Sequence, residues 1–402
     1  MYLTPRPTIN LYSVEHSALW RILFSITQQL LLIKYKKEST LRDSYKIIIW
    51  GPGRMGSICL WEMAQSPYFE IVGVKAYSAS KEGLDAGELI GIDPIGVKVS
   101  CDSEALLKLD CDCVVYTAHD EGTFHTDEEI FSILRAGKNI VTPLPYQNAH
   151  LFREESFTRK LREACQEGQS VFYSGGIDPD LIPNRVLLAL TGGCADVKAI
   201  RLQENWDCSE AAPGPLQYIG FGKPPEDAEK IEVSKKMAAN FMLSIVKTAE
   251  KVLGVEYDKI EASHDYVATP VDIHEPFYIK TGTVGRITHR MQGFCSNIGD
   301  EALFTIEYHW LIGNGMLPEG TLPGQYYVAT IEGRPSMKMT LDFCVSNNSD
   351  ERFFNMGNMQ VEPNYIATII PCVQAIPHVC AAEPGIMESF DPSLNWRQDP
   401  RI

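Results

Sequence analysis

Hydrophobic and polar positions alternate in a regular order from about Tyr45 to Ser174. Short apolar runs rich in β-branched residues alternate with segments whose apolar residues recur at helical spacing. The runs that predict strands are 46–50, 70–77, 113–117, 139–142 and 170–173. The segments that predict helices are 55–65, 127–136 and 154–167. Strands that alternate with helices are typical of a doubly wound parallel sheet, the α/β class.

The pattern changes after about Pro183 to longer strand-like stretches. These stretches are 197–204, 282–293, 303–311 and 326–332, and one helical stretch at 233–253 lies among them. Four or more strands with few helices predict a separate, largely antiparallel α+β domain. Helical character returns at 362–376, where Pro371 predicts a kink or a break. Pro384-Gly385 is expected to end the organised chain.

These patterns divide the 402 residues into five parts, and the length fits two main domains. We expect an N-terminal extension at 1–45, a dinucleotide-binding domain at 46–183 and an α+β domain for substrate binding and dimerisation at 184–361. A helical segment at 362–386 is expected to return to the first domain, and 387–402 form a tail.

The N-terminal extension contains an apolar stretch at 18–33. Arg21, Gln28 and Gln29 interrupt it, and it is shorter than the roughly 20 apolar residues of a spanning helix, so we expect no membrane anchor. Excess Lys and Arg give the extension some transit-peptide character, whereas an added helix or an over-extended gene model explains it equally well. We predict a cytoplasmic protein.

Charge and cysteine content narrow the function classes further. The formal net charge of -16 is spread along the chain, which argues against nucleic-acid binding. The eleven cysteines include no CxxC pair and many lie in apolar runs, so we expect reduced thiols. No histidine or cysteine spacing predicts a metal site.

The sequence GPGRMG at 51–56 follows the first predicted strand and opens the first predicted helix. The glycines Gly51, Gly53 and Gly56 fit the dinucleotide fingerprint, in which they allow a tight turn, close approach of the pyrophosphate and close helix-to-strand contact. The pyrophosphate would lie at the helix N-terminus. Further cofactor contacts are expected from Arg54 and Met55 of the loop and from Thr117 at the end of the strand 113–117.

The end of the second strand indicates which nicotinamide dinucleotide is bound. An Asp or Glu usually follows the second strand in NAD-preferring folds, where it binds the ribose hydroxyls. The chain has Ser78, Ser80 and Lys81 there instead. Hydroxyls and a cation accommodate a 2′-phosphate, so NADP is favoured over NAD and dual use stays open. A solvated turn is the alternative explanation.

The glycine loop and several later motifs resemble the dihydrodipicolinate reductase-like NAD(P)H-dependent oxidoreductases, the group that includes native amine dehydrogenases. The similar stretches extend from about Lys46 to Ile386 and include DAGEL at 85–89, AGKNIVT at 136–142, SGGIDP at 174–179, GFGKPP at 220–225 and IPHVCAA at 376–382. The resemblance implies a Rossmann domain joined to an α+β domain, a homodimer built through the second domain's sheet, and hydride transfer to C=N or C=O.

The chain departs from that family at one catalytic position. The resemblance implies a glutamate after the strand 139–142 that activates ammonia or the amine, but the chain reads TPLPYQN at 142–148. Four residues are candidates for the missing polar group: Tyr146, Glu204 after a strand of the second domain, Asp178 at the domain junction, and His119 after the strand 113–117. Each has an alternative explanation: Tyr146 packs on the nicotinamide, Glu204 is a solvated strand end, Asp178 is a turn or cap residue, and His119 is structural or solvent-facing.

The resulting prediction is an NAD(P)H-dependent reductase of a C=N or C=O group in a small substrate, with an amine dehydrogenase whose base comes from elsewhere left open. The missing glutamate leaves a second hypothesis, a non-catalytic protein that binds or senses NADP. A reductase consumes NAD(P)H whereas a sensor only binds it, so cofactor consumption distinguishes the two hypotheses. The fold alone does not identify the substrate.

Overall fold

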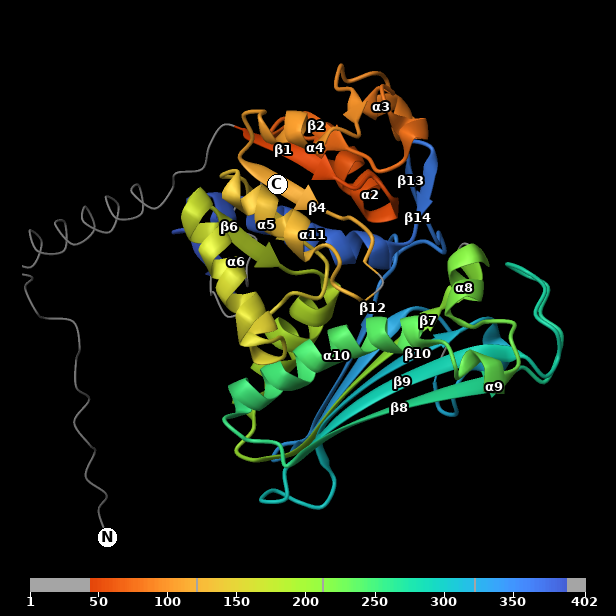
Figure 1. Ribbon diagram of the computed structural model, residues 1–402. Helices are drawn as coiled ribbons and strands as arrows, with labels where there is room; N and C mark the ends of the chain where they lie inside the picture. Colours follow the sequence, from red (N-terminus) through yellow and green to blue (C-terminus); the bar gives the residue numbers. More distant parts are fainter. Residues whose placement is uncertain (1–43, 121, 212, 322, 389–402) are drawn as a thin grey trace, which may run out of the picture. The chain divides into compact units, whose positions relative to one another are not determined.

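The computed structural model describes residues 44–388 apart from 121, 212 and 322. Two sheets form its framework, one of seven parallel strands and one of six mixed strands (Figure 1). The predicted fold class is therefore confirmed. Residues 1–43 and 389–402 lie outside the described residues, and they include most of the predicted extension and tail.

The seven-stranded sheet carries the predicted dinucleotide fold. Its strands lie in the order β15-β6-β5-β4-β1-β2-β3, so the chain runs outward from β1 in one direction and then from β4 in the other. The ligand crevice of such sheets lies where the order reverses, here between the ends of β1 and β4. The strands are β1 (Tyr45–Trp50), β2 (Phe69–Lys75), β3 (Val99–Ser100), β4 (Cys113–Tyr116), β5 (Asn139–Thr142), β6 (Val171–Ser174) and β15 (Gly385–Met387).

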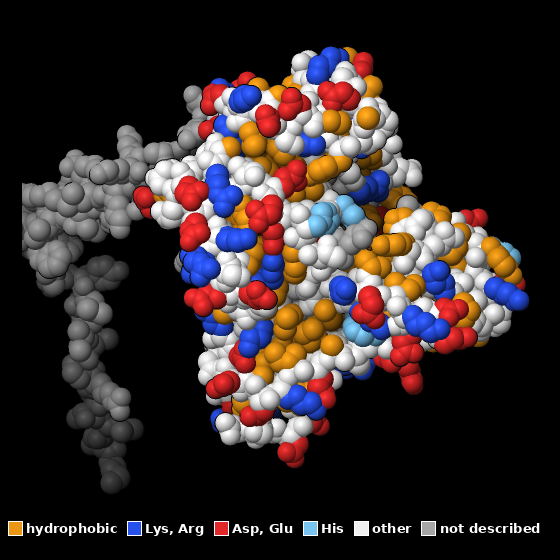
Figure 2. All heavy atoms as spheres, viewed as in Figure 1, with side chains coloured by type: hydrophobic (Ala, Val, Ile, Leu, Met, Phe, Trp, Pro, Cys, Tyr) orange, Lys and Arg blue, Asp and Glu red, His pale blue; other side chains and the backbone are white. Residues whose placement is uncertain are grey.

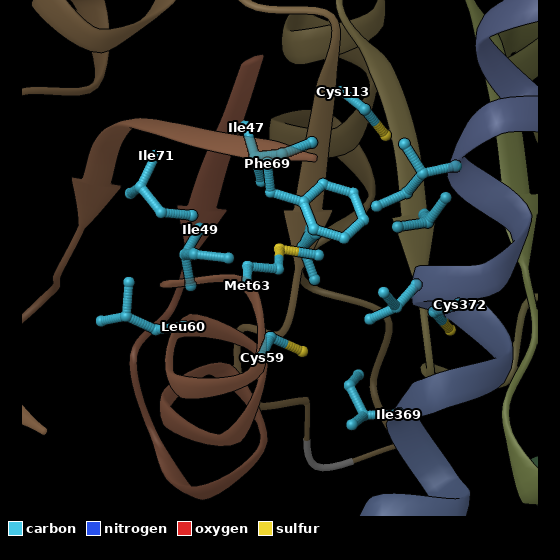
Figure 3. Close-up of a cluster of buried hydrophobic side chains, with 14 of the residues drawn as sticks. Ile47, Ile49, Cys59, Leu60, Met63, Phe69, Ile71, Cys113, Ile369 and Cys372 are labelled. Carbon is cyan, nitrogen blue, oxygen red and sulfur yellow. The ribbon is translucent and has the colours of Figure 1, made fainter. Parts of the chain in front are cut away.

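Helices cover both faces of this sheet. Ile47 and Ile49 of β1 pack in one buried cluster with α2 (Arg54–Ala64) and α11 (Pro363–Ala381), and Figure 3 shows their side chains between the two helices and the strands. The alternate strand residues pack on the opposite face against α5 (Asp127–Arg135) and α6 (Glu155–Gly168). Two shorter helices, α3 (Ala86–Leu89) and α4 (Ser103–Leu107), lie in the connection from β2 to β4. Burial on both faces explains why the strand sequences are almost wholly apolar.

The C-terminal part of the chain differs from the prediction in two ways. Helix α11 continues to Ala381 although it contains Pro371 and Pro377. Its buried residues pack on the sheet, and this tertiary contact compensates for the backbone hydrogen bonds that the prolines remove. Pro384-Gly385 does not end the organised chain, because β15 pairs with β6 in parallel.

The six-stranded sheet has the order β12-β11-β7-β10-β9-β8. All neighbouring pairs are antiparallel except β7 with β10, so the sheet is mixed. The predicted strands include neither β8 nor β12. Its strands are β7 (Val197–Asp207), β8 (Lys259–Ala268), β9 (Val284–Phe294), β10 (Ala302–Leu311), β11 (Tyr326–Gly333) and β12 (Met337–Asp342). A separate hairpin follows, formed by β13 (Phe354–Met356) and β14 (Met359–Val361).

Helix α10 (Glu232–Leu253) lies along one face of the six-stranded sheet (Figure 1). Ala238, Met242, Ile245 and Ala249 recur at helical spacing, are buried, and pack with apolar strand residues. The helix ends at Gly254, which has a φ of +66°. Two short helices, α8 (Pro213–Ile219) and α9 (Pro225–Ala228), precede α10.

The surface and the cysteines bear on the remaining predictions. Acidic and basic side chains are interspersed over the face shown in Figure 2. Among the described residues, no helix is long and apolar enough to cross a membrane, and no group of His, Cys, Asp or Glu could hold a metal ion. All eleven cysteines are free thiols.

Candidate active site

A cavity of about 600 Å³ opens where the parallel sheet meets helix α10. Its walls come from the glycine loop after β1, from the segments that follow β2, β4 and β5, and from α10. The α10 residues are Met237, Asn240 and Phe241, and Thr368 of α11 completes the wall. The cavity therefore joins the dinucleotide-binding sheet to an element that packs on the second sheet.

The three predicted glycines have different surroundings in the glycine loop. Gly51 has a φ of +96°, and a Cβ there would lie 2.8 Å from the backbone N of Ala118. A Cβ on Gly56 would lie 2.3 Å from the carbonyl O of Gly51. Gly53 has nothing within 4 Å of the Cβ position and lines the cavity. Gly51 and Gly56 thus hold the turn together, whereas Gly53 leaves room for close approach of a pyrophosphate.

Side chains from neighbouring segments fix this loop. The hydroxyl of Thr117 donates to the carbonyl O of Gly51 (2.8 Å), and the ammonium of Lys81 donates to the carbonyl O of Pro52 (2.7 Å). The Arg54 guanidinium donates to the carbonyl O of Gln360. Thr117, Lys81 and Arg54 all line the cavity, as does Met55. Arg54 from the loop and Lys81 from the segment after β2 thus place two cations beside the position where a dinucleotide would bind.

The segment after β2 supplies hydroxyls and amines to the cavity. Ser78 lines it, and its hydroxyl lies 2.7 Å from that of Ser80. Lys75, the last residue of β2, is buried beneath the Tyr77 ring, with its Nζ 4.3 Å from the ring centroid. Tyr77 itself lines the cavity and is 56% exposed. No carboxylate therefore occupies the position that usually binds the ribose hydroxyls in NAD-preferring folds.

The loop after β4 brings His119 to the cavity wall, together with Asp120. The Asp120 carboxylate accepts hydrogen bonds from the backbone N–H groups of Gly122 (2.7 Å) and Thr123 (3.0 Å). The carbonyl O of Gly122 in turn accepts a hydrogen bond from the Asn240 amide of α10 (3.1 Å). The loop that carries His119 is thus tied to α10.

Two of the predicted catalytic residues, Asp178 and Glu204, are brought together by Tyr327. The Tyr327 hydroxyl lies 2.8 Å from Asp178 Oδ2 and 3.1 Å from Glu204 Oε1. A phenol has one hydrogen, so both contacts are hydrogen bonds only if one carboxyl group donates a proton. The indole N–H of Trp310 also donates to Glu204 (3.4 Å). The geometry therefore fits a pair of carboxyl groups that share a proton.

The electrostatics of the pair agree with this geometry. Burial raises the pKa of Glu204 to about 7, against the opposing effect of its hydrogen bonds from Tyr327 and Trp310. Burial, followed by the charge of Glu204, raises the pKa of Asp178 well above its usual range. Two such groups titrate as a unit, and near neutral pH they hold a proton that can be donated or accepted.

Neither carboxyl group of the acidic pair belongs to the lining of the cavity, but the backbone before Asp178 contacts the cavity wall. Asp178 follows Gly176 by two residues at the carboxyl end of β6. A Cβ on Gly176 would lie 3.2 Å from the carbonyl O of Thr368 and 3.8 Å from the Cα of Pro143, and both of these residues line the cavity. One turn of backbone therefore separates the cavity wall from Asp178.

Comparison with known proteins shows what this arrangement resembles. The family model of the N-terminal part of dihydrodipicolinate reductase matches residues 45–142. An amine dehydrogenase of Streptomyces virginiae is 28% identical over 359 residues, which cover 86% of this chain and 95% of that protein. The chain is an NAD(P)-dependent oxidoreductase that is similar to dihydrodipicolinate reductase in its N-terminal part and to amine dehydrogenases along most of its length. The predicted family resemblance and the nicotinamide cofactor are thereby confirmed.

Two further relatives of this oxidoreductase match along most of its length. A 2,4-diaminopentanoate dehydrogenase of Acetoanaerobium sticklandii is 23% identical over 363 residues, which cover 87% of this chain and 93% of that protein. The structure of an amine dehydrogenase from Mycobacterium smegmatis superposes with a TM-score of 0.67 at 19% identity, covering 87% of this chain and 96% of that one. The structural likeness shows a common fold.

Tyr146 takes the packing position in this oxidoreductase. It is 2% exposed, its ring packs with Phe157 and Phe172, and its hydroxyl donates to Asp127 (2.6 Å). Tyr146 is absent from the residues that line the cavity. Its hydroxyl is committed to Asp127 and Thr126 within an aromatic cluster, so the structure favours packing over proton donation for Tyr146. Leu144 and Pro145, two residues of the same stretch, face the cavity instead.

Sequence reasoning missed the aromatic partners of the acidic pair. Tyr308 of β10 and Tyr327 of β11 both stand opposite Glu204 of β7 in the strand register. Residues opposite each other in neighbouring strands project from the same face of a sheet. The strand order β11-β7-β10 and the parallel pairing of β7 with β10 are long-range features, and no local signal in the sequence indicates them.

Proposed function

We propose that the protein reduces a C=N or C=O bond of a small, amine-related substrate with NADPH, and that Glu204 exchanges the proton with the substrate heteroatom. The Tyr327 hydroxyl between two carboxyl groups carries this proposal, because its two contacts fit a proton shared by Asp178 and Glu204. Hydride transfer to C=N or C=O needs such a proton at the nitrogen or oxygen. The names of the related amine and diaminopentanoate dehydrogenases support an amine-related substrate.

The residues around the cavity fit a dinucleotide. Gly53 leaves the open position that a pyrophosphate needs, and the N-terminus of α2 faces it with free backbone N–H groups. The bound cofactor would supply the hydride. In reduction, the O–H bond of the Glu204 carboxyl breaks as the new N–H or O–H bond forms. In amine oxidation, the Glu204 carboxylate accepts a proton from the substrate ammonium. Glu204 thus performs the role that the missing glutamate has in the family.

The pH dependence of turnover tests the role of Glu204. A donor with a pKa of about 7 is protonated below that pH, so reduction should slow as the pH rises through about 7. The oxidation rate should fall as the pH drops below about 7, because the carboxylate is then protonated. In Glu204→Gln, the rates of reduction and of oxidation should no longer change with pH around 7, and kcat should fall by about 10²- to 10⁴-fold.

The matched control is Glu261→Gln, which changes an exposed carboxylate of β8 in the same sheet. Substrates are small ketones, aldehydes and cyclic imines, each with and without ammonium, and NADPH oxidation is measured. We expect carbonyls and preformed imines to be reduced faster than ketones are aminated. A Glu204→Gln enzyme with the wild-type pH profile contradicts the proposal. If NADPH binds but no substrate is turned over, the sensor hypothesis is favoured.

We propose a preference for NADP over NAD on the basis of Ser78, Ser80 and Lys81. The Lys81 ammonium contacts the glycine loop, and the Ser78 and Ser80 hydroxyls are joined to each other beside it. Lys81→Ala should weaken NADPH binding about 10-fold and NADH binding much less, since only NADPH has the 2′-phosphate whereas the contact of Lys81 with Pro52 supports the loop for both cofactors. Fluorescence titration with both cofactors measures this. A preference for NADH that Lys81→Ala leaves unaltered contradicts the proposal.

We also propose a homodimer formed through the face of the six-stranded sheet opposite α10. Glu307 on that face is buried, and its contacts with His309, Arg201 and Arg290 lower the pKa of Glu307 to about 2 against the effect of burial. A self-complementary pattern of both charges suits a two-fold interface. Light scattering that gives the monomer mass at all concentrations contradicts this proposal.

A further inference from the structure

Five neighbouring strands of the second sheet contribute polar side chains to one row. The register pairs His264 of β8 with His289 of β9, His289 with Tyr308 of β10, Tyr308 with Glu204 of β7, and Glu204 with Tyr327 of β11. Opposite residues share a face, so the five side chains lie side by side. The row connects the edge strand β8 with the acidic pair.

Within the row, a hydrogen bond joins His264 to His289, but none joins His289 to Tyr308. His264 Nδ1 lies 2.7 Å from His289 Nδ1. His289 Nε2 is buried and has no hydrogen-bond partner among the described residues, and the buried Tyr308 hydroxyl meets no strict hydrogen-bond geometry although it interacts with Asp178. Tyr308 interacts electrostatically with the carboxyl groups of Asp178 and Glu204. Buried polar atoms without partners are rare and call for an explanation, and here one of them belongs to His289, which lies opposite Tyr308 in the adjacent strand.

The two imidazoles suit proton transfer without carrying a permanent charge. Burial, His264 and Lys235 lower the pKa of His289 to about 3, and burial, more than Lys235, lowers the pKa of His264. A neutral imidazole accepts a proton at one nitrogen while it donates from the other. His264 is only partly buried, and the charges of Lys235 and Glu232 of α10 and of Asp265 act on it. The row therefore leads from Glu204 to a charged surface.

We propose that His264, His289 and Tyr308 return protons between solvent and Glu204 during turnover. This inference rests on the proposed function. After reduction, Glu204 has lost its proton to the product, and bound ligands would separate it from the solvent in the cavity. A proton then enters at His264, passes from Nδ1 to Nδ1 and leaves His289 at Nε2. The Tyr308 hydroxyl passes it to the carboxyl pair, which is restored to its starting state.

Kinetics of single and repeated turnovers test this path. In His289→Gln and His264→Gln, the first hydride transfer should keep its wild-type rate, because Glu204 already holds a proton. Steady-state kcat should fall at least about 10-fold, so that a burst of NADPH oxidation appears. His264→Gln changes a partly exposed residue and keeps the experiment informative if the buried His289 variant does not fold. Added imidazole should restore part of kcat in His264→Gln.

His274→Gln, which changes an exposed histidine of the β8–β9 loop, is the control and should show no burst. Wild-type kcat in both row variants overturns the proton path. An equal loss of single-turnover and steady-state rates also overturns it, because a structural role would then suffice. If instead Glu204→Gln leaves the single-turnover rate unchanged, the proposed function fails first, and this outcome is distinct from either result.

Discussion

Gly53 and Gly56 belong to the same motif but should respond differently to an added methyl group. Nothing lies within 4 Å of a Cβ on Gly53, whose φ of −80° suits alanine. Gly53→Ala should therefore keep the wild-type stability to within about 1 kcal/mol and weaken NADPH binding at least about 10-fold. A Cβ on Gly56 would lie 2.3 Å from the Gly51 carbonyl O, so Gly56→Ala should also lower Tm.

Thermal unfolding and NADPH fluorescence titration of both variants separate the two effects. Unchanged NADPH affinity in Gly53→Ala would place the pyrophosphate elsewhere. An unaltered Tm in Gly56→Ala would show that the loop can widen without cost.

At the residue level, the sequence identified Asp178 and Glu204 as candidate catalytic residues but did not predict which side chains they contact. The local pattern shows that Asp178 follows a parallel strand, whereas it placed Glu204 at a strand end although β7 continues to Asp207. Their meeting through Tyr327 depends on strand register, which is set by contacts between residues 123 to 149 positions apart. For Tyr146 the structure favours packing, because a phenol close in sequence to the cofactor strands can equally complete an aromatic cluster.

The loop between β4 and α5 is the element that links the cofactor side of the cavity to α10. Gly122 in this loop has a φ of +77°, and a Cβ there would lie 2.9 Å from the backbone N of Met237. Gly122→Ala should push the loop away from α10, open the cavity and raise the Kd for NADPH roughly 10-fold, since Met237 and Asn240 form part of its wall.

Gly96→Ala provides the matched control for Gly122→Ala. Gly96 has a φ of +79° and nothing within 4 Å of a Cβ, so its replacement introduces similar backbone strain without the contact. Both variants should lose about 1 kcal/mol of stability from the positive φ. Equal NADPH affinities in the two variants would show that contact between this loop and α10 does not shape the cavity.

At the element level, the parallel sheet was more predictable than the mixed one. Each βαβ unit buries its strand on both faces, so apolar runs and intervening helical spacing identify it locally. Strand β8 has only partly buried or exposed side chains and gives no strong hydrophobic signal, whereas the six residues of β12 alternate between apolar and polar and carried a strand signal that our prediction missed. Helix α11 passes through Pro371 because packing on the sheet outweighs the local preference.

At the scale of the whole molecule, the half-buried Glu204 and the buried His289 make stability depend on pH in opposite directions. The pKa of Glu204 is raised from 4.5 to about 7, so its contribution is present below pH 4.5 and is lost as the pH rises through about 7. The pKa of His289 is lowered from 6.5 to about 3, so its contribution is present above pH 6.5 and is lost as the pH falls through about 3. Between pH 4.5 and 6.5 the two effects oppose each other.

Replacing Glu204 should therefore reveal a pH dependence that is partly hidden in the wild type. Glu204→Gln removes the loss on the alkaline side, so its free energy of unfolding should increase relative to wild type as the pH rises from 4.5 to 7.5. A shift of 2.5 pKa units corresponds to about 3 kcal/mol, and partial exposure of Glu204 reduces this to roughly 1–3 kcal/mol. Because Asp178 titrates with Glu204, the difference in the free energy of unfolding belongs to the pair.

Urea denaturation followed by tryptophan fluorescence at a series of pH values measures this difference. Parallel stability curves for the two proteins would mean that the carboxyl pair holds no shared proton in the folded state, which would also remove the basis for Glu204 as the proton donor.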